Sequence, residues 1–217
     1  MKTEYTQRLP HIQPVGAVFF VTYCLFGCVP KRKLQELKEK YTGEIAKANQ
    51  IIDRHQRNME VFNIRKRYLF EYDQTLHSIE DGPDFLKDDH LKNLIRDELF
   101  KYDGILYELL SFCIMSNHVH ILIDTSIQLS EINDDEALEM KYVSLDQIMK
   151  KIKGPTAMYC NRALNRSGQF WERESFDIYI RNDRMLNNVI SYILQNPVKA
   201  GLVKEWEKYP YNYIMSK

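Results

Sequence analysis

The chain has 217 residues, of which 44% are hydrophobic and 28% are charged. This length suits one α/β domain with room for an elaboration, and the composition excludes a disordered or fibrous chain. No stretch approaches the roughly 18 uninterrupted apolar residues of a membrane-spanning helix. The polar N-terminus also lacks the segment order of a signal peptide, so we expect a cytoplasmic protein with no membrane partner.

The formal net charge is zero, but the charges are unevenly distributed along the chain. Lys31–Tyr72 holds eleven Lys/Arg and six Asp/Glu, and Val143–Lys217 holds twelve and seven. Between them, Asp124–Tyr142 holds six Asp/Glu and one lysine. Basic regions attract phosphate backbones, but solvated helix faces have the same composition, so charge alone leaves a nucleic-acid partner open.

The four cysteines indicate core packing rather than a metal or disulfide site. None belongs to a CxxC pair, and three of them lie in apolar runs, where a cysteine behaves as a small hydrophobic residue. They are Cys24, Cys28, Cys113 and Cys160.

The first half of the chain predicts a strand followed by helices. Val15–Tyr23 is rich in β-branched and aromatic residues, which is typical of a strand. Residues 33–70 carry helix-forming residues with scattered apolar positions and are predicted to be mostly helical. Asp81–Asp84 predicts a turn, and Asp88 or Asp89 is expected to cap a helix through Leu99.

The second half begins with the clearest hairpin, in which Ile105–Met115 and His118–Asp124 are strands separated by a short polar break. A helix is predicted from Ser144 to about residue 164, with Gly154-Pro155 kinking or interrupting it. Residues 170–180 read as extended, and Asp183 is expected to cap a last main helix that ends near residue 196. This order predicts an α+β fold, an antiparallel sheet with helices packed on one face.

His118-Val119-His120 is the sharpest local feature of the sequence. On a strand, residues two apart project from the same face, so both imidazoles can reach one cation while Val119 packs on the other side. Two polar histidines on a half-exposed strand would give the same pattern. The pair therefore indicates a metal site without establishing one.

Several enzyme classes place such a histidine pair on a strand, and the remaining histidines discriminate among them. Cupin-type dioxygenases and amidohydrolases need further histidines downstream, whereas no histidine follows His120 in this chain. Any third ligand after the hairpin must therefore be a carboxylate or an amide, which excludes those two classes.

Three blocks of the sequence resemble the IS200-like and REP-associated tyrosine transposases, which are HUH enzymes with one catalytic tyrosine. Phe112–Ile123 resembles the family's strand–turn–strand around the histidine pair, and Phe170–Asp177 resembles its F-W-Q-R block. Tyr192–Val203, which reads YILQNPVKAGLV, matches its Y-I-x-x-N-P-V-K-A-G-L-V signature. The blocks occur in family order and extend over about residues 14–217, with weak matching over 31–101.

The resemblance implies a ferredoxin-like or RRM-like HUH nuclease fold and a role for each site residue. His118 and His120 would be the pair that holds Mg²⁺ or Mn²⁺, and Asn196 would complete the metal shell. Tyr192 would be the nucleophile that attacks a DNA phosphodiester, forming a 5′-phosphotyrosine and freeing a 3′-hydroxyl.

The spacing of Tyr192 and Asn196 agrees with these roles, because residues i and i+4 of a helix lie on one face. Pro197 leaves the backbone at Asn196 less regular. With 14 tyrosines in the chain, a position at the edge of the core is the default for any one of them. Tyr179 is the rival nucleophile, but it lies in the predicted extended segment, and Asp183 four residues later is better used as a helix cap.

Six further residues are candidates for DNA contact. An indole can stack on a base, guanidinium groups can pair with phosphates, and lysines can attract the backbone. A tryptophan is as often a core residue, however, and a lysine cluster is as often a solvated face. The candidates are Trp171, Arg173, Arg181, Lys150, Lys151 and Lys153.

Two segments depart from the family. The segment 31–101 is longer than the usual helix between the first strand and the HUH hairpin, and we interpret it as a helical elaboration of a single domain spanning 1–217. The loop at about 126–142 is acidic, and acidic side chains repel phosphate. We therefore expect this loop to point away from the substrate or to gate it.

Together these features predict a metal-dependent single-strand DNA endonuclease and strand transferase that acts near a hairpin, as a monomer or a homodimer. A domesticated DNA-hairpin-binding protein without catalysis is the alternative, although a pure binder has no need of the two histidines, the tyrosine and the asparagine together. A metal hydrolase of small phosphoesters is a third possibility, but it would not require the tyrosine. The target sequence and the metal used in the cell are not encoded in these patterns.

Overall fold

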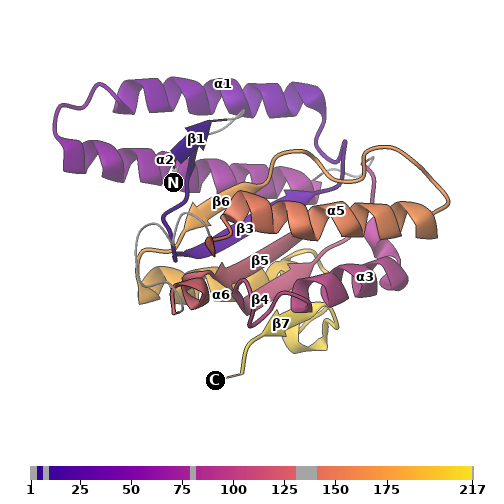
Figure 1. The fold of residues 1–217 in the computed structure, drawn as a ribbon. Coiled ribbons are helices and arrows are strands. Elements are labelled where there is room, and N and C mark those ends of the chain that lie inside the picture. The colour runs from indigo at the N-terminus through magenta and orange to yellow at the C-terminus, as the bar shows by residue number, and fades with distance from the viewer. Residues whose placement is uncertain (1–3, 7–9, 79–81, 131–140, 217) are drawn as a thin grey trace. The chain divides into compact units, whose positions relative to one another are not determined.

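The structure is a computed structural model that describes residues 4–6, 10–78, 82–130 and 141–216. The chain divides into two compact units (Figure 1). One consists of Met1–Leu25 and Asp84–Lys217, and the other of Phe26–Pro83. None of the described helices combines the length and the apolar character needed to cross a membrane.

The first unit is built around a five-stranded sheet in which every pair of neighbours is antiparallel. The strand that carries the two histidines lies in the middle, so its backbone is hydrogen-bonded on both sides. In spatial order the strands are β6 (Phe176–Tyr179), β3 (Val18–Cys24), β5 (His118–Asp124), β4 (Glu108–Ile114) and β7 (Asn212–Ile214). The predicted α+β fold with an antiparallel sheet is confirmed.

The hairpin of β4 and β5 forms where the sequence predicts it. Val119, Ile121 and Ile123 are fully buried on one face of β5, as expected for the apolar half of an alternating strand. The register between β4 and β5 shifts at Leu109/Ser111, a β-bulge that the hydrophobic pattern does not reveal. A separate two-stranded ribbon pairs β1 (Glu4–Thr6) with β2 (Pro10–Ile12).

Helices α3 (Asp89–Phe100) and α5 (Leu145–Ala163) contact each other in this unit, and Figure 1 shows α5 running across the sheet. Both begin at the predicted caps. The Asp88 side chain accepts from the His90 amide, and Ser144 forms a capping box with Gln147. Helix α6 (Asp183–Leu194) packs against β4 and β5.

Helix α5 continues through Gly154-Pro155, where the sequence predicts a kink or an interruption. A proline removes one backbone donor from a helix interior. The next residue stays tied to the preceding turn, because the Thr156 hydroxyl donates to the Ile152 carbonyl at 2.7 Å. Buried positions on both sides of the proline, such as Ile152 and Cys160, keep the helix on its packing face.

The cap of α6 differs from the prediction by one residue. Asn182, not Asp183, is the N-cap, and its side-chain oxygen accepts from the Met185 amide at 2.9 Å. Asp183 is the first helical residue, where its negative charge lies near the positive end of the helix dipole. The described part of the first unit also contains three 3₁₀ turns: Phe85–Lys87, Ser126–Leu129 and Trp206–Lys208.

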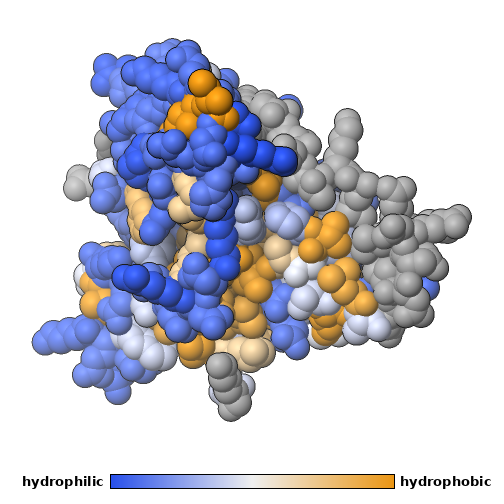
Figure 2. All heavy atoms as spheres, turned by 90° about the vertical axis from the view of Figure 1, so that its left-hand side faces the viewer, coloured by the Kyte–Doolittle hydropathy of each residue, from blue (hydrophilic) through white to orange (hydrophobic). Residues whose placement is uncertain are grey.

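The second unit is a helical hairpin of α1 (Lys31–Ala48) and α2 (Arg54–Ser78). The rings of Tyr41 and Tyr68, with centres 4.6 Å apart and planes tilted by 35°, pack between the two helices. Ion pairs from Lys40 to Glu71 and from Arg67 to Glu44 cross between them. Figure 2 shows mainly hydrophilic side chains on the outside of this unit, at the top of the view, interrupted by a small apolar group.

The predicted elaboration at 31–101 is therefore divided between the units, because α3 belongs with the sheet and only α1 and α2 form the hairpin. The break between α1 and α2 follows from Asp53, whose carboxylate accepts from the Gln56 amide at 2.6 Å and so begins a new helix. Residues 131–140, the centre of the predicted acidic loop, lie outside the described residues.

Candidate metal and tyrosine site

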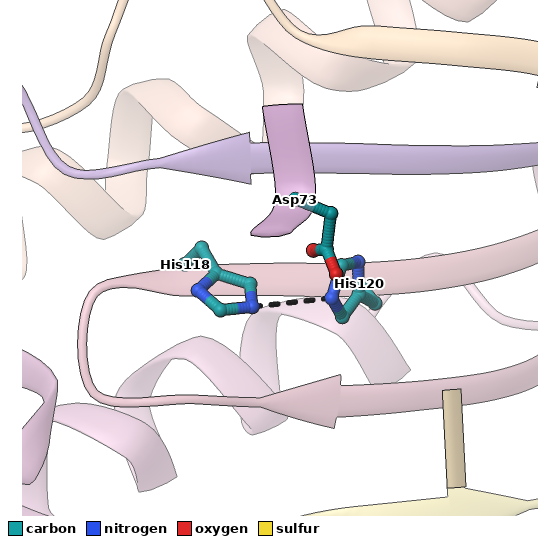
Figure 3. Close-up of side chains that lie close together, drawn as sticks. All are labelled: Asp73, His118 and His120. Carbon is teal, nitrogen blue, oxygen red and sulfur yellow. Dashed lines mark hydrogen bonds between the residues drawn. The ribbon is translucent and has the colours of Figure 1, made fainter. Parts of the chain in front are cut away.

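The imidazoles of His118 and His120 face each other on the central strand. Their Nε2 atoms are 3.1 Å apart, and their ring centres are 4.7 Å apart (Figure 3). The side chains are 1% and 0% exposed. The strand alternation that predicts a shared face thus brings the two ring nitrogens within reach of one ion.

Two neighbouring side chains fix the orientation of these rings. The Asn117 side-chain oxygen lies 2.6 Å from His118 Nδ1, and the Thr22 hydroxyl lies 2.8 Å from His120 Nδ1. An amide oxygen only accepts, so His118 Nδ1 carries the proton and Nε2 presents its lone pair. A metal-binding histidine ordinarily uses its second ring nitrogen in this way.

Asn117 and Thr22 are absent from the sequence-based set of site residues. Thr22 is the direct strand partner of His120, but that register is not visible in the sequence. The available signals were a polar residue inside the apolar run Val15–Tyr23 and an amide immediately before His118.

Asn196 supplies the third group. It is fully buried, and its Nδ2 atom lies 3.1 Å from His120 Nε2. Its Oδ1 atom is buried without a hydrogen-bond partner. A half-turn about the last side-chain bond exchanges the two atoms and places the oxygen toward the histidine nitrogens.

This donor set fits a divalent cation. The Nε2 atoms of His118 and His120, 3.1 Å apart, can share either a proton or a cation. A buried amide oxygen without a partner is costly, and coordination would remove that cost. Imidazole nitrogens and an amide oxygen are ligands that Mn²⁺ accepts, and Mg²⁺ accepts the oxygen and keeps waters.

The Tyr192 ring packs directly beside this cluster. Its centre lies 5.8 Å from that of His120, edge to face, and 6.0 Å from that of Phe20. Phe20 also contacts the His120 ring at 5.5 Å. Tyr192 on α6 therefore lies against His120 on β5 of the same chain.

The rival Tyr179 lies on the opposite face of the sheet. It pairs with Phe19 on β3, whereas Thr22 and Phe20, two residues apart, face the histidines. Side chains alternate across a strand, so Phe19 and Tyr179 project away from the site. The Tyr179 ring is instead covered by the Arg181 guanidinium, 4.9 Å from its centre.

The connection from α6 to α7 (Asn196–Lys199) keeps Tyr192 and Asn196 in register. Gln195 between the helices retains right-handed helical angles, and its amide bonds to Ser191 at 3.0 Å. Pro197 lies in the first turn of α7, where a missing amide is harmless. The Asn212 side chain of β7 donates to the Leu194 carbonyl at 2.9 Å and so caps the end of α6.

The candidates for DNA contact lie apart from the histidines and have different environments. Trp171 is 4% exposed, its indole N–H donates to the Thr156 hydroxyl, and its ring packs on Tyr23, which is a core role. Lys153 donates to the carbonyls of Glu172 and Arg173 and to the Ser175 hydroxyl. The Lys150, Lys151 and Arg173 side chains are exposed, and Arg181 is half-buried.

A cavity of about 600 Å³ lies between α5 and residues 168–175. It is lined by Lys150, Lys153 and Arg173, but also by carboxylates that include Glu172 and Asp177. Val21 and its strand partner Asp177 place the cavity on the face of the sheet opposite the histidines. Three of the five basic residues singled out in the sequence thus gather at a second place with mixed charge.

Lys153 leads to a pH-dependent prediction. Burial lowers the pKa of its ammonium group from 10.5 to about 8. Between about pH 8 and 10.5 the folded chain has released a proton that the unfolded chain still holds, so stability rises with pH there. The three oxygen atoms that accept from the Lys153 ammonium group favour its charged form. We therefore expect the free energy of unfolding to rise by less than about 3 kcal/mol over this pH range. Urea titrations of the wild type and Lys153→Met at pH 7 and pH 10 measure it, because the variant lacks this contribution.

Comparison with known proteins gives one curated relative. The chain is 31% identical over 106 residues to a Haemophilus influenzae protein described as "Putative REP-associated tyrosine transposase". The match covers 49% of this chain and 58% of that protein, so it extends over little more than half of the relative. No protein-family model matches the chain. The resemblance to REP-associated tyrosine transposases stated from the sequence motifs is confirmed by this relative.

Among solved structures, the chain is similar to that of a REP-associated tyrosine transposase bound to a REP hairpin. The sequence identity is 16% and the TM-score is 0.48, with 97% of this chain and 82% of the other covered.

Proposed function

We propose that the chain is a metal-dependent enzyme that nicks and rejoins single-stranded DNA beside a hairpin, as its resemblance to tyrosine transposases implies. One observation carries the proposal. The imidazoles of His118 and His120, the amide of Asn196 and the ring of Tyr192 meet on one face of the sheet. His120 and Asn196 are 76 positions apart in the sequence, so this meeting is a product of the fold.

The tyrosine performs the covalent step. Its hydroxyl oxygen forms a bond to a DNA phosphorus atom, and the bond from phosphorus to the 3′ oxygen breaks. The phenol gives up a proton and the 3′ oxygen takes one up, so no oxidant or reductant is needed. The 5′-phosphotyrosine conserves the energy of the broken bond, and a 3′-hydroxyl can therefore reverse the step and join strands.

The other residues hold the reacting groups in place. His118, His120 and Asn196 would bind Mg²⁺ or Mn²⁺, which would polarise the phosphate and offset its developing charge. Asn117 and Thr22 keep the ring nitrogens pointed toward the ion, and Phe20 packs on both His120 and Tyr192. Such fixed orientation reduces the reorganisation needed in the transition state.

We place DNA backbone contacts on the exposed cations Lys150, Lys151 and Arg173 and on the half-buried Arg181. Trp171 and Lys153 support these contacts indirectly, because their polar groups already bond within the protein. This division predicts that the exposed cations change the salt dependence of DNA binding, whereas the two inner residues change stability.

A labelled hairpin oligonucleotide taken from the sequence flanking the gene tests the proposal. With Mn²⁺ present, a 3′-end label should shift to a protein-linked band on a denaturing gel, and a 5′-end label should appear on a shorter fragment ending in a 3′-hydroxyl. Hairpin binding without a linked band would identify a binding protein instead. Release of free fragments without a linked band would identify a hydrolase.

A further inference from the structure

The Lys199 ammonium group lies 4.6 Å from the centre of the Tyr192 ring. We propose that Lys199 holds a non-bridging oxygen of the scissile phosphate beside the nucleophile. This inference rests on the proposed function, since it concerns the same phosphate. Lys199 would touch the reacting group and would thus be a further catalytic residue.

The backbone presents Lys199 on the same side of the chain as the other site residues. Tyr192, Asn196 and Lys199 are spaced i, i+4 and i+7 across the near-continuous passage from α6 to α7, which places them along one helical face. The Lys199 amide bonds to the Gln195 carbonyl at 3.0 Å. Gly201, at φ +70°, then ends the turn in a conformation that favours glycine.

A phosphate at this site would gain from a positive charge fixed in the protein, in addition to the charge of a bound divalent cation. The aromatic rings in contact with that of Tyr192 belong to His120 and Phe20, while a phosphodiester carries a full negative charge that spreads in the transition state. Within the described part of the chain no carboxylate forms an ion pair with Lys199, so its charge is available to a ligand. Its side chain is exposed, as contact with DNA requires.

A packing role is the competing explanation, because lysine stems often cover aromatic rings. Lys199→Met keeps an unbranched stem of similar length against the ring and removes the charge. Lys199→Arg keeps the charge and changes its shape. Lys204→Met is the matched control, since Lys204 is exposed five residues later and its replacement changes the net charge equally.

The experiment measures single-turnover formation of the protein-linked band at saturating hairpin DNA with Mn²⁺, together with hairpin affinity. We expect Lys199→Met to slow the reaction by about 10- to 100-fold, with Lys199→Arg restoring most of the rate and Lys204→Met within about two-fold of wild type. When the scissile phosphate is replaced by a neutral methylphosphonate, the ratio of wild-type to Lys199→Met rates should fall toward one.

A Lys199→Met rate equal to that of Lys204→Met would overturn the inference and leave the proposed function intact. Weaker hairpin binding with an unchanged rate at saturation would also overturn it, because Lys199 would then be a general DNA contact. A wild-type protein that forms no linked band would overturn both the inference and the proposed function.

Discussion

Tyr192→Phe is expected to abolish the covalent protein–DNA product while leaving hairpin binding within about two-fold of wild type. The substitution removes one hydroxyl oxygen and keeps the ring contacts with His120 and Phe20. Without that oxygen no phosphotyrosine can form, so the loss should reach the detection limit of the gel rather than a partial decrease.

Tyr179→Phe is the matched control, because Tyr179 lies on the other face of the sheet beside Arg181. It should react at the wild-type rate. Were Tyr192→Phe to retain the linked band and Tyr179→Phe to lose it, the assignment of the nucleophile would be wrong. A hydrolase acting on small phosphoesters would show equal activity in both variants.

Replacement of His120 by alanine is expected to have the second largest effect. The loss of one ligand from a three-residue donor set, and with it most metal binding, should lower the rate of linked-band formation by about 10³-fold or more. Chelation by EDTA should have the same effect on the wild type, and added Mn²⁺ should reverse it.

Metal binding itself supplies an independent measurement. Mn²⁺ should raise the melting temperature of the wild type, because a ligand that binds only the folded state stabilises it. The increase should be absent from His120→Ala and reduced in Thr22→Val, since loss of a ring-orienting partner costs about 10- to 100-fold in metal affinity. A full increase in His120→Ala would contradict the assignment of the metal ligands.

The sequence was most informative where local geometry alone decides which side chains meet. Strand alternation predicts the common face of His118 and His120, and helical spacing predicts that of Tyr192 and Asn196. The resemblance to a known family then connected the two pairs. The antiparallel sheet, the hairpin and the caps at Asp88 and Ser144 follow from patterns of the same local kind.

The sequence was least informative where strand register and tertiary packing decide. The contact of Thr22 with His120 depends on the pairing of β3 with β5, which residue types do not encode. Lys153 looks like part of an exposed lysine cluster, yet its ammonium bonds to the chain of residues 172–175. Asp53 is a helix-capping residue type and marks the break between α1 and α2. The helix-forming residues on both sides of it nevertheless predict one mostly helical segment over 33–70.

The central position of β5 has a consequence for which parts of the site can move. A strand bonded to neighbours on both sides opens only when the whole sheet unfolds, so its amides should be among the slowest to exchange with solvent. The helix that carries Tyr192 has one face open to solvent and no such constraint. In the proposed cycle of cutting and resealing, the imidazoles of His118 and His120 would stay in place while the side chain of Tyr192 moves.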